Sequence, residues 1–119
     1  MSLKTVGVSS DQVALLNDIA ENIERIQIYV HGLDRASFER DSRTYDAVER
    51  CVERICEAAV RLGESAEILM PNQPWSEIRG TGNWLRHAYH RIDARLIWET
   101  VERDLPVLLA DVRAALEKL

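Results

Sequence analysis

The chain has 119 residues, of which 46% are hydrophobic and 29% charged, and it carries a formal net charge of -5. This length is enough for one domain with a single core, and the composition is that of a globular chain rather than a disordered one. The acidic balance argues against a wide, sequence-independent grip on a nucleic-acid backbone, although it leaves room for a small basic pocket.

The first predicted helix begins at Ser10, a candidate N-cap, and ends at Gly32. Its apolar residues recur at alternating spacings of three and four, which places them on one side of a helix. They are Leu16, Ile19, Ile23, Ile26 and Val30. The connector from Leu33 to Ser42 is expected to contain one short turn of helix around Ala36 to Glu39.

A second long helix is predicted from Arg43 to Leu62, with Ser42 as a candidate N-cap. Its apolar seam again alternates three and four, through Tyr45, Val48, Val52, Ile55, Ala59 and Leu62. The opposite face is read as a charged, solvated surface with two i, i+4 ion pairs, Asp46 to Arg50 and Glu57 to Arg61. Gly63 either ends this helix or interrupts a weaker continuation to Leu69.

The third helix follows a proline-bounded loop and begins at Trp75 or Ser76. Its seam consists of Trp75, Ile78, Gly82, Leu85 and Tyr89. Gly80 and Gly82 lie inside this helix, where each costs roughly 1 kcal/mol relative to alanine. A glycine on a helix seam lets another backbone approach closely, and either an active site or a helix crossing could use that.

Asp93 is the predicted N-cap of a fourth helix, which then breaks and restarts around Pro106 with Asp104 as the new cap. Its apolar residues are Leu96, Ile97, Trp98, Val101, Leu108, Val112, Leu116 and Leu119. No segment shows a convincing strand pattern. We therefore predict an all-α fold, an antiparallel up-and-down bundle of four long helices plus short helical pieces. Residues 10–119 form the single domain, preceded by residues 1–9 as a flexible extension or cloning remnant.

One window, Arg79 to His90, concentrates the residues suited to chemistry. A polar stripe runs along it at i, i+4, i+7, i+8 and i+11, through Arg79, Asn83, Arg86, His87 and His90. Arginine offers a permanent planar fork of donors and histidine titrates near neutral pH, which suits a phosphate group. A solvated helix face remains the alternative. Trp84 falls between this stripe and the seam and is a candidate partner contact, or the cover of a loop.

Cys51 and Cys56 are five residues apart, a rise of about 7.5 Å along a helix, which is too far for a disulfide. No Cys-x-x-Cys pair is present, so we expect no zinc. Two unbridged thiols fit a reducing cytoplasm. No apolar run is as long as a membrane span and no signal-peptide core is present, so we expect a cytoplasmic protein without membrane contact.

These residues together resemble the HepT-like branch of the HEPN superfamily, over about Ser10 to Leu116. The matching text is Pro74-Trp75, Asn83 with His87 and Tyr89, Ile92-Asp93, Asp104-Leu105-Pro106 and the upstream run Thr44 to Arg50. The resemblance implies a helical homodimer whose motif residues face a shared cleft. It also implies a toxin that cuts RNA without a metal or other cofactor. Its partner would be a minimal nucleotidyltransferase antitoxin, which in the family adds AMP to the motif tyrosine.

The chain departs from this pattern at Gly82, where the family carries its motif arginine. Cleavage of a phosphodiester needs a group that moves protons and a group that stabilises the charge on phosphorus. The resemblance gives the first role to His87, with Asn83 as the motif asparagine. Arg79 or Arg86, on the same stripe, could take the place of the missing arginine.

Two functions therefore stay open. The first is a metal-independent ribonuclease toxin, weakened by Gly82, with His87, Arg79, Arg86 and Asn83 as its catalytic set. The second is a catalytically silent dimeric binding module that serves the nucleotidyltransferase as a scaffold, or as a substrate modified at Tyr89. A purely structural helical dimer is a third reading.

Overall fold

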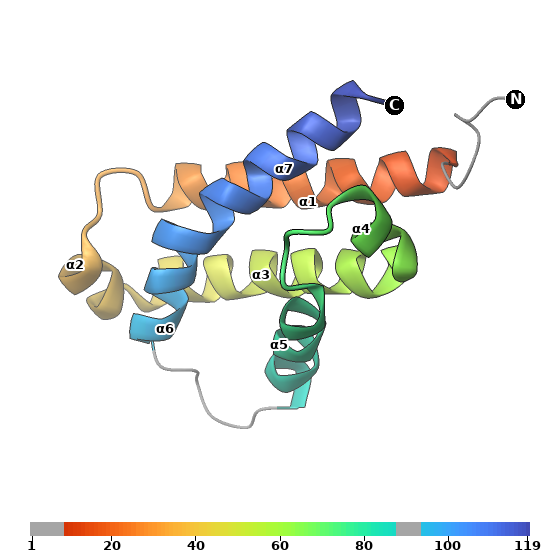
Figure 1. Cartoon of the computed structure of the whole chain (residues 1–119). Helices are drawn as coiled ribbons and strands as arrows, with labels where there is room; N and C mark the ends of the chain where they lie inside the picture. The colour runs from red at the N-terminus through yellow and green to blue at the C-terminus, as the bar shows by residue number, and fades with distance from the viewer. Residues whose placement is uncertain (1–8, 88–93) are drawn as a thin grey trace, which may run out of the picture.

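The structure, a computed structural model, describes residues 9–87 and 94–119, and every regular element in these ranges is a helix (Figure 1). The elements are α1 (Ser10–Tyr29), α2 (Arg35–Arg40), α3 (Ser42–Leu62), α4 (Glu64–Leu69), α5 (Trp75–His87), α6 (Ala94–Glu99), the π-helical turn η2 (Thr100–Asp104) and α7 (Leu105–Glu117). The all-α prediction is confirmed.

Helices α1 and α3 lie side by side and antiparallel, and they form the long axis of a molecule that measures 53 × 30 × 21 Å (Figure 1). Helix α7 packs across α1, and α5 packs on α3. Figure 1 shows α5 running across the direction of α1 and α3 rather than along it. This helix therefore departs from a simple up-and-down arrangement, and its last residues project away from the α1–α3 pair.

The caps of the long helices lie one residue earlier than predicted. Ser9, which we assigned to the N-terminal extension, caps α1: its hydroxyl accepts from the Gln12 N–H at 3.2 Å, and its own N–H donates to the Gln12 side chain at 2.7 Å. Asp41 rather than Ser42 caps α3, by accepting from the Thr44 N–H at 3.0 Å. Residues 1–8 lie outside the described part of the chain.

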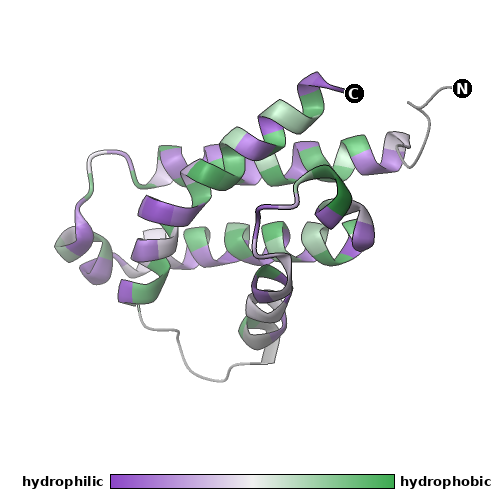
Figure 2. Cartoon of the chain, viewed as in Figure 1, coloured by the Kyte–Doolittle hydropathy of each residue, from purple (hydrophilic) through white to green (hydrophobic). Residues whose placement is uncertain are grey.

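Gly63 ends α3, with a φ of +57° that side chains rarely adopt, so α4 is a separate helix rather than a continuation. The short turn predicted in the connector is α2, which Asp34 caps by accepting from the Ser37 N–H. The core lies where α1, α3 and α7 meet, and Figure 2 shows the apolar residues along the facing sides of these helices. The side chains that are almost fully buried include Leu16, Ile19, Ile23, Ile26, Val48, Ile55 and Val112.

The predicted break at Pro106 is wrong, because the helix continues from Ala94 to Glu117 through η2. Asp104 has helical backbone angles and makes no side-chain cap bond. The Leu105 N–H donates instead to the Thr100 carbonyl, five residues back. A proline lacks an N–H and its ring crowds the preceding turn, and the wider π-helical turn relieves both problems without interrupting the helix. Asp93, the cap predicted for this helix, lies outside the described residues.

None of the helices in the described ranges has both the length and the apolar content needed to cross a membrane.

Candidate functional site

Helix α5 carries the predicted site, and its first residue anchors it. The Trp75 side chain is buried, and its indole N–H donates to the Met70 carbonyl at 2.8 Å. Leu85 is buried further along the same side of the helix, and Gly82 is buried between them. The apolar seam predicted for this helix is therefore confirmed as far as Leu85, while Tyr89 lies outside the described residues.

At Gly82 the backbone of α5 lies directly against Cys56 of α3. A Cβ atom at this position would overlap the Cβ of Cys56 and would lie 3.6 Å from its Cα. Gly80, two residues earlier in the same helix, has nothing within 4 Å of the equivalent position. Of the two uses that the sequence left open for a seam glycine, the structure therefore supports a helix crossing. It also leaves no space at position 82 for a side chain as large as that of arginine.

Arg79 leaves the polar stripe and turns back onto the end of α3. Its Nε donates to the Ala59 carbonyl at 3.3 Å and its Nη2 to the Gly63 carbonyl at 2.8 Å. Both terminal nitrogens also hold Glu67 of α4, at 2.8 and 2.7 Å. The Ala59 carbonyl belongs to the last turn of α3, where carbonyls lack a partner within the helix, and Gly63 follows that turn. Arg79 therefore caps α3 and connects α4 and α5 to it.

The charges of this pair reinforce each other. The side-chain hydrogen bonds from Arg79 lower the pKa of Glu67, and the bonded Glu67 carboxylate raises the pKa of Arg79. The Arg79 guanidinium therefore stays charged. Hydrogen bonds from its Nε and from both terminal nitrogens fix its position. This geometry favours a structural role for Arg79, and its predicted catalytic role stays untested.

The remaining site residues follow on α5. Asn83 is exposed on its outer side. Arg86 and His87 belong to the same unbroken helix, so the backbone keeps the i, i+4, i+7 and i+8 spacing of the predicted stripe. The side chains of Arg86, His87 and Trp84 lie outside what the structure describes, as do Tyr89 and His90 altogether.

A cleft of about 440 Å³ lies beside α5, between it, α3 and the start of α7. Its walls are mostly apolar, with Thr81, Thr100, Arg103 and Asp104 among the polar residues. The sequence pattern assigned Asp104 to a helix cap and to the Asp-Leu-Pro motif of the resemblance, and it did not single out Arg103.

No group of three histidine, cysteine, aspartate or glutamate side chains within residues 9–87 and 94–119 is arranged to hold a metal ion. The two cysteines are both buried as thiols, and no disulfide joins them. The polar groups that α5 offers are amide and guanidinium donors together with one histidine. Such a set can bind a phosphate group and transfer a proton.

Comparison with known proteins adds independent information. The family model Ribonuclease HepT-like matches residues 19–115. A protein of Thermococcus cleftensis named "Probable ribonuclease HepT" is 38% identical over 93 residues, which cover 78% of this chain and 84% of that protein. A protein of Methanocaldococcus jannaschii named "Putative RNase MJ1380" is 32% identical over 102 residues, 86% of this chain and 94% of that protein. No solved structure matches the chain.

Proposed function

The chain belongs to the Ribonuclease HepT-like family, and on that premise we propose that it is the toxin of a toxin–antitoxin system and cleaves RNA without a metal ion. The observation that carries the proposal is the family match over residues 19–115, which includes the window from Arg79 to His90. The unbroken helix that presents Asn83, Arg86 and His87 at one-face spacing supports it.

In the proposed mechanism, His87 acts as the general acid or the general base. It transfers a proton while the phosphodiester bond of the RNA is cleaved. A guanidinium stabilises the charge that builds on phosphorus, and Asn83 donates its amide to the same group. Arg79 is already bound to two carbonyls and to Glu67, so Arg86 is the stronger candidate for the guanidinium. Removal of such a donor typically costs about 10²–10³ in rate, so the absence of an arginine at position 82 predicts a slow enzyme.

The proposed enzyme is a homodimer in which α5 of each copy faces a shared cleft. This assembly rests on the family membership. Among the described residues, neither Arg79 nor Asn83 lines the cleft of about 440 Å³ beside α5. Light scattering of the purified protein tests this assembly, and a monomer at micromolar concentration would contradict it.

The decisive test is cleavage of single-stranded RNA by the purified protein in EDTA. His87→Ala should lose cleavage, while the control variant His31→Ala, at an exposed residue outside α5, should keep it. Melting temperatures of both variants show whether they fold. Equal activity of His87→Ala and the native protein would remove this proposal.

A second candidate function rests on Gly82, which packs against Cys56 where the motif arginine would stand. Here the chain is a catalytically silent dimer that serves a minimal nucleotidyltransferase as a scaffold, or as a substrate modified with AMP at Tyr89. Both candidates place the protein in the cytoplasm. Mass spectrometry after incubation with ATP and the partner tests the modification. No mass gain, or a gain that survives Tyr89→Phe, argues against it.

A further inference from the structure

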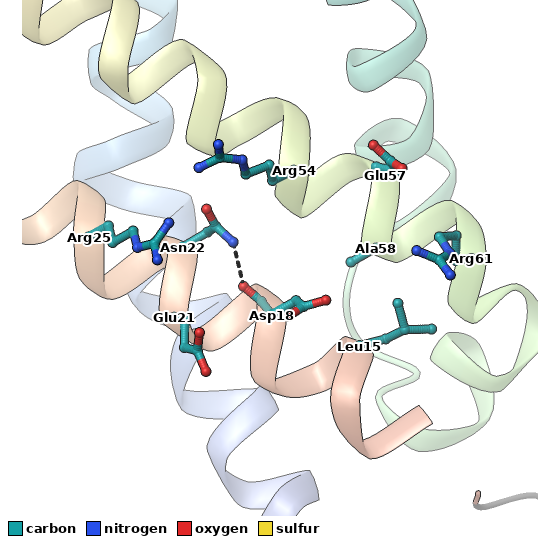
Figure 3. Close-up of a pocket in the computed structure, with 9 residues that line it drawn as sticks. All are labelled: Leu15, Asp18, Glu21, Asn22, Arg25, Arg54, Glu57, Ala58 and Arg61. Atoms are coloured by element: carbon teal, nitrogen blue, oxygen red, sulfur yellow. Dashed lines mark hydrogen bonds between the residues drawn. The ribbon is translucent and has the colours of Figure 1, made fainter. Parts of the chain in front are cut away.

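A polar groove of about 290 Å³ lies between α1 and α3, away from the residues proposed for cleavage (Figure 3). We call it the α1–α3 groove. The residues that matter for its chemistry are Asp18, Glu21, Asn22, Arg25, Arg54 and Arg61. The sequence analysis read the α3 part of this surface as a solvated face, and the family match assigns it no role.

Asn22 is the buried polar centre of the groove. Its side chain is only 7% exposed, and its Nδ2 donates to the Asp18 carbonyl at 2.8 Å. Its Oδ1 is buried and has no hydrogen-bond partner among the residues that the structure describes. Figure 3 shows this oxygen turned away from Asp18, with the amide between the side chains of Arg25 and Arg54. An unsatisfied buried acceptor is costly, and a leucine here would avoid the cost, so the amide calls for an explanation outside the fold.

The arginines around Asn22 form no salt bridge with a described carboxylate, although Arg54 makes a side-chain hydrogen bond with Cys51. Among the described residues, no ion pair joins Arg25, Arg54 or Arg61 to a carboxylate, although Asp18, Glu21 and Glu57 line the same groove. Elsewhere on α1 a pair does form, between Glu24 and Arg113 at 2.6 Å. The groove thus presents guanidinium groups that no described carboxylate neutralises, carboxylate acceptors, and one buried amide acceptor without a described partner.

The two helices present these groups in register. Asp18, Asn22 and Arg25 follow one another at i, i+4 and i+7 on α1, and Arg54, Ala58 and Arg61 repeat that spacing on α3. The small side chain of Ala58 lines the groove between its two arginines, which keeps this part of the wall low. A ligand can therefore lie along the groove and meet a guanidinium at more than one point.

We infer that the α1–α3 groove binds a ribonucleotide, with its phosphate on Arg25 and Arg54 and its ribose hydroxyls on Asn22 Oδ1 and the neighbouring carboxylates. Guanidinium forks match phosphate oxygens. Carboxylates bind ribose hydroxyls, and the 2′-hydroxyl is the donor that distinguishes RNA from DNA. A fully deprotonated anion such as sulfate offers no hydrogen-bond donor to Asn22, and a metal cation does not bind the arginines.

Other ligands also carry both a phosphate and hydroxyl groups. The choice of a ribonucleotide among them rests on the proposed ribonuclease function. The same chemistry is present in a free 5′-nucleotide and in a nucleotide within an RNA strand. The experiment therefore compares AMP, a single-stranded RNA and a DNA strand of the same sequence.

Calorimetric titration of the full chain with each probe tests the inference. Asn22→Leu and Arg54→Gln should each weaken binding about tenfold or more, which is the effect of losing one hydrogen bond to a charged or buried group. Arg43→Gln, the same substitution at an exposed position of α3 outside the groove, should leave affinity unchanged. Melting temperatures verify that each variant folds, and Arg25→Gln repeats the arginine test on the other helix.

The outcomes separate the possibilities. Binding of AMP that is lost in 2′,3′-dideoxy-AMP supports the inference with a free nucleotide as ligand, and binding of RNA but neither AMP nor DNA supports it with an RNA strand. Equal binding of RNA and DNA, binding unaffected by Asn22→Leu, or no binding of AMP or RNA overturns it. His87→Ala should cleave no RNA yet bind the same probe, so a failure of this site and a failure of the proposed cleavage can be told apart.

Discussion

Helix α3 borders two regions that use arginine in opposite ways. Toward α5, Arg79 closes the end of α3 with hydrogen bonds to Gly63 and Glu67, and Gly82 fits against Cys56 without a gap. Toward α1, the amide oxygen of Asn22 has no hydrogen-bond partner in the described part of the chain, and the arginines around it form no ion pair with the carboxylates described there. The first region is closed and the second is open.

Residue type alone does not identify a functional site. Arg79 belongs to the window richest in functional residue types, yet its donors are used by the backbone of α3 and by Glu67. Arg54 lies on a helix face that reads as ordinary solvated surface, yet it borders a buried acceptor with no partner. The two arginines differ in whether the polar groups around them have hydrogen-bond partners. This difference is informative because a buried polar group without a partner destabilises the fold.

The largest change in the free energy of unfolding is expected from substitutions at the two glycines of α5. Gly82→Ala should lower the free energy of unfolding by about 1–3 kcal/mol, because the new Cβ overlaps that of Cys56 and forces α5 away from α3. Gly80→Ala should raise it by roughly 0.5–1 kcal/mol, because its Cβ meets open space and alanine favours the helix. Urea unfolding of both variants measures the difference. Effects of the same sign would mean that α5 does not cross α3 closely.

The sequence could predict the long helices because their apolar periodicity is strong and their ends carry capping residues. Each cap was misplaced by one residue, since Ser9 and Asp41 precede residues of equal capping ability. The Ser-x-x-Gln spacing from Ser9 was the signal that favours it as the cap. The continuation of the helix through Pro106 could not be predicted. It depends on a π-helical turn before the proline, and no local sequence pattern predicts such a turn.

The site was predictable in spacing but not in contacts. The stripe on α5 follows from helical geometry, whereas the partners of Arg79 come from α3 and α4, 12 to 20 residues earlier in the chain. The same limit explains the ion pairs predicted on α3: neither forms among the described residues, and Arg50 instead contacts Glu53 at 3.2 Å. Asn22 did carry a signal, because it lies three residues after Ile19 and four before Ile26, on the apolar side of α1.

A second test asks which of Arg79 and Arg86, the two candidates for the catalytic guanidinium, acts in cleavage. Arg79→Gln should lower the free energy of unfolding by about 1–2 kcal/mol, because it removes hydrogen bonds to Gly63 and Glu67. The folded variant should cleave RNA at close to the native rate. Arg86→Gln should instead lower kcat about 10²–10³-fold with little change in stability. A loss of cleavage by folded Arg79→Gln that matches that of Arg86→Gln would make Arg79 a catalytic residue.

A third test removes the unsatisfied acceptor from the open region. Asn22→Leu should raise the free energy of unfolding by about 1 kcal/mol, because it replaces a buried amide oxygen without a partner by apolar surface. Asn17→Leu, at an exposed position of the same helix, provides the matched control and should change stability by less than about 0.5 kcal/mol. Thermal unfolding of both variants gives the comparison. A destabilised Asn22→Leu would show that the amide serves the fold, and the contrast between the two regions would disappear.

The smallest effect concerns pH and the closed region alone. Hydrogen bonds from Arg79 hold the pKa of Glu67 below its ordinary value of 4.5 in the folded protein. A group whose pKa is lowered on folding contributes stability above its unfolded pKa and loses it as the pH falls through the folded pKa. The native protein should therefore lose stability as the pH falls below about 4.5, and part of this loss should be missing in Glu67→Gln. Melting temperatures measured from pH 6 to pH 3 test this. Glu64→Gln, on the same helix but leaving the Arg79–Glu67 pair intact, is the matched control. If the two variants lose stability with the same pH dependence, the ion pair does not hold α4 to α5, and Arg79 becomes available for a catalytic role.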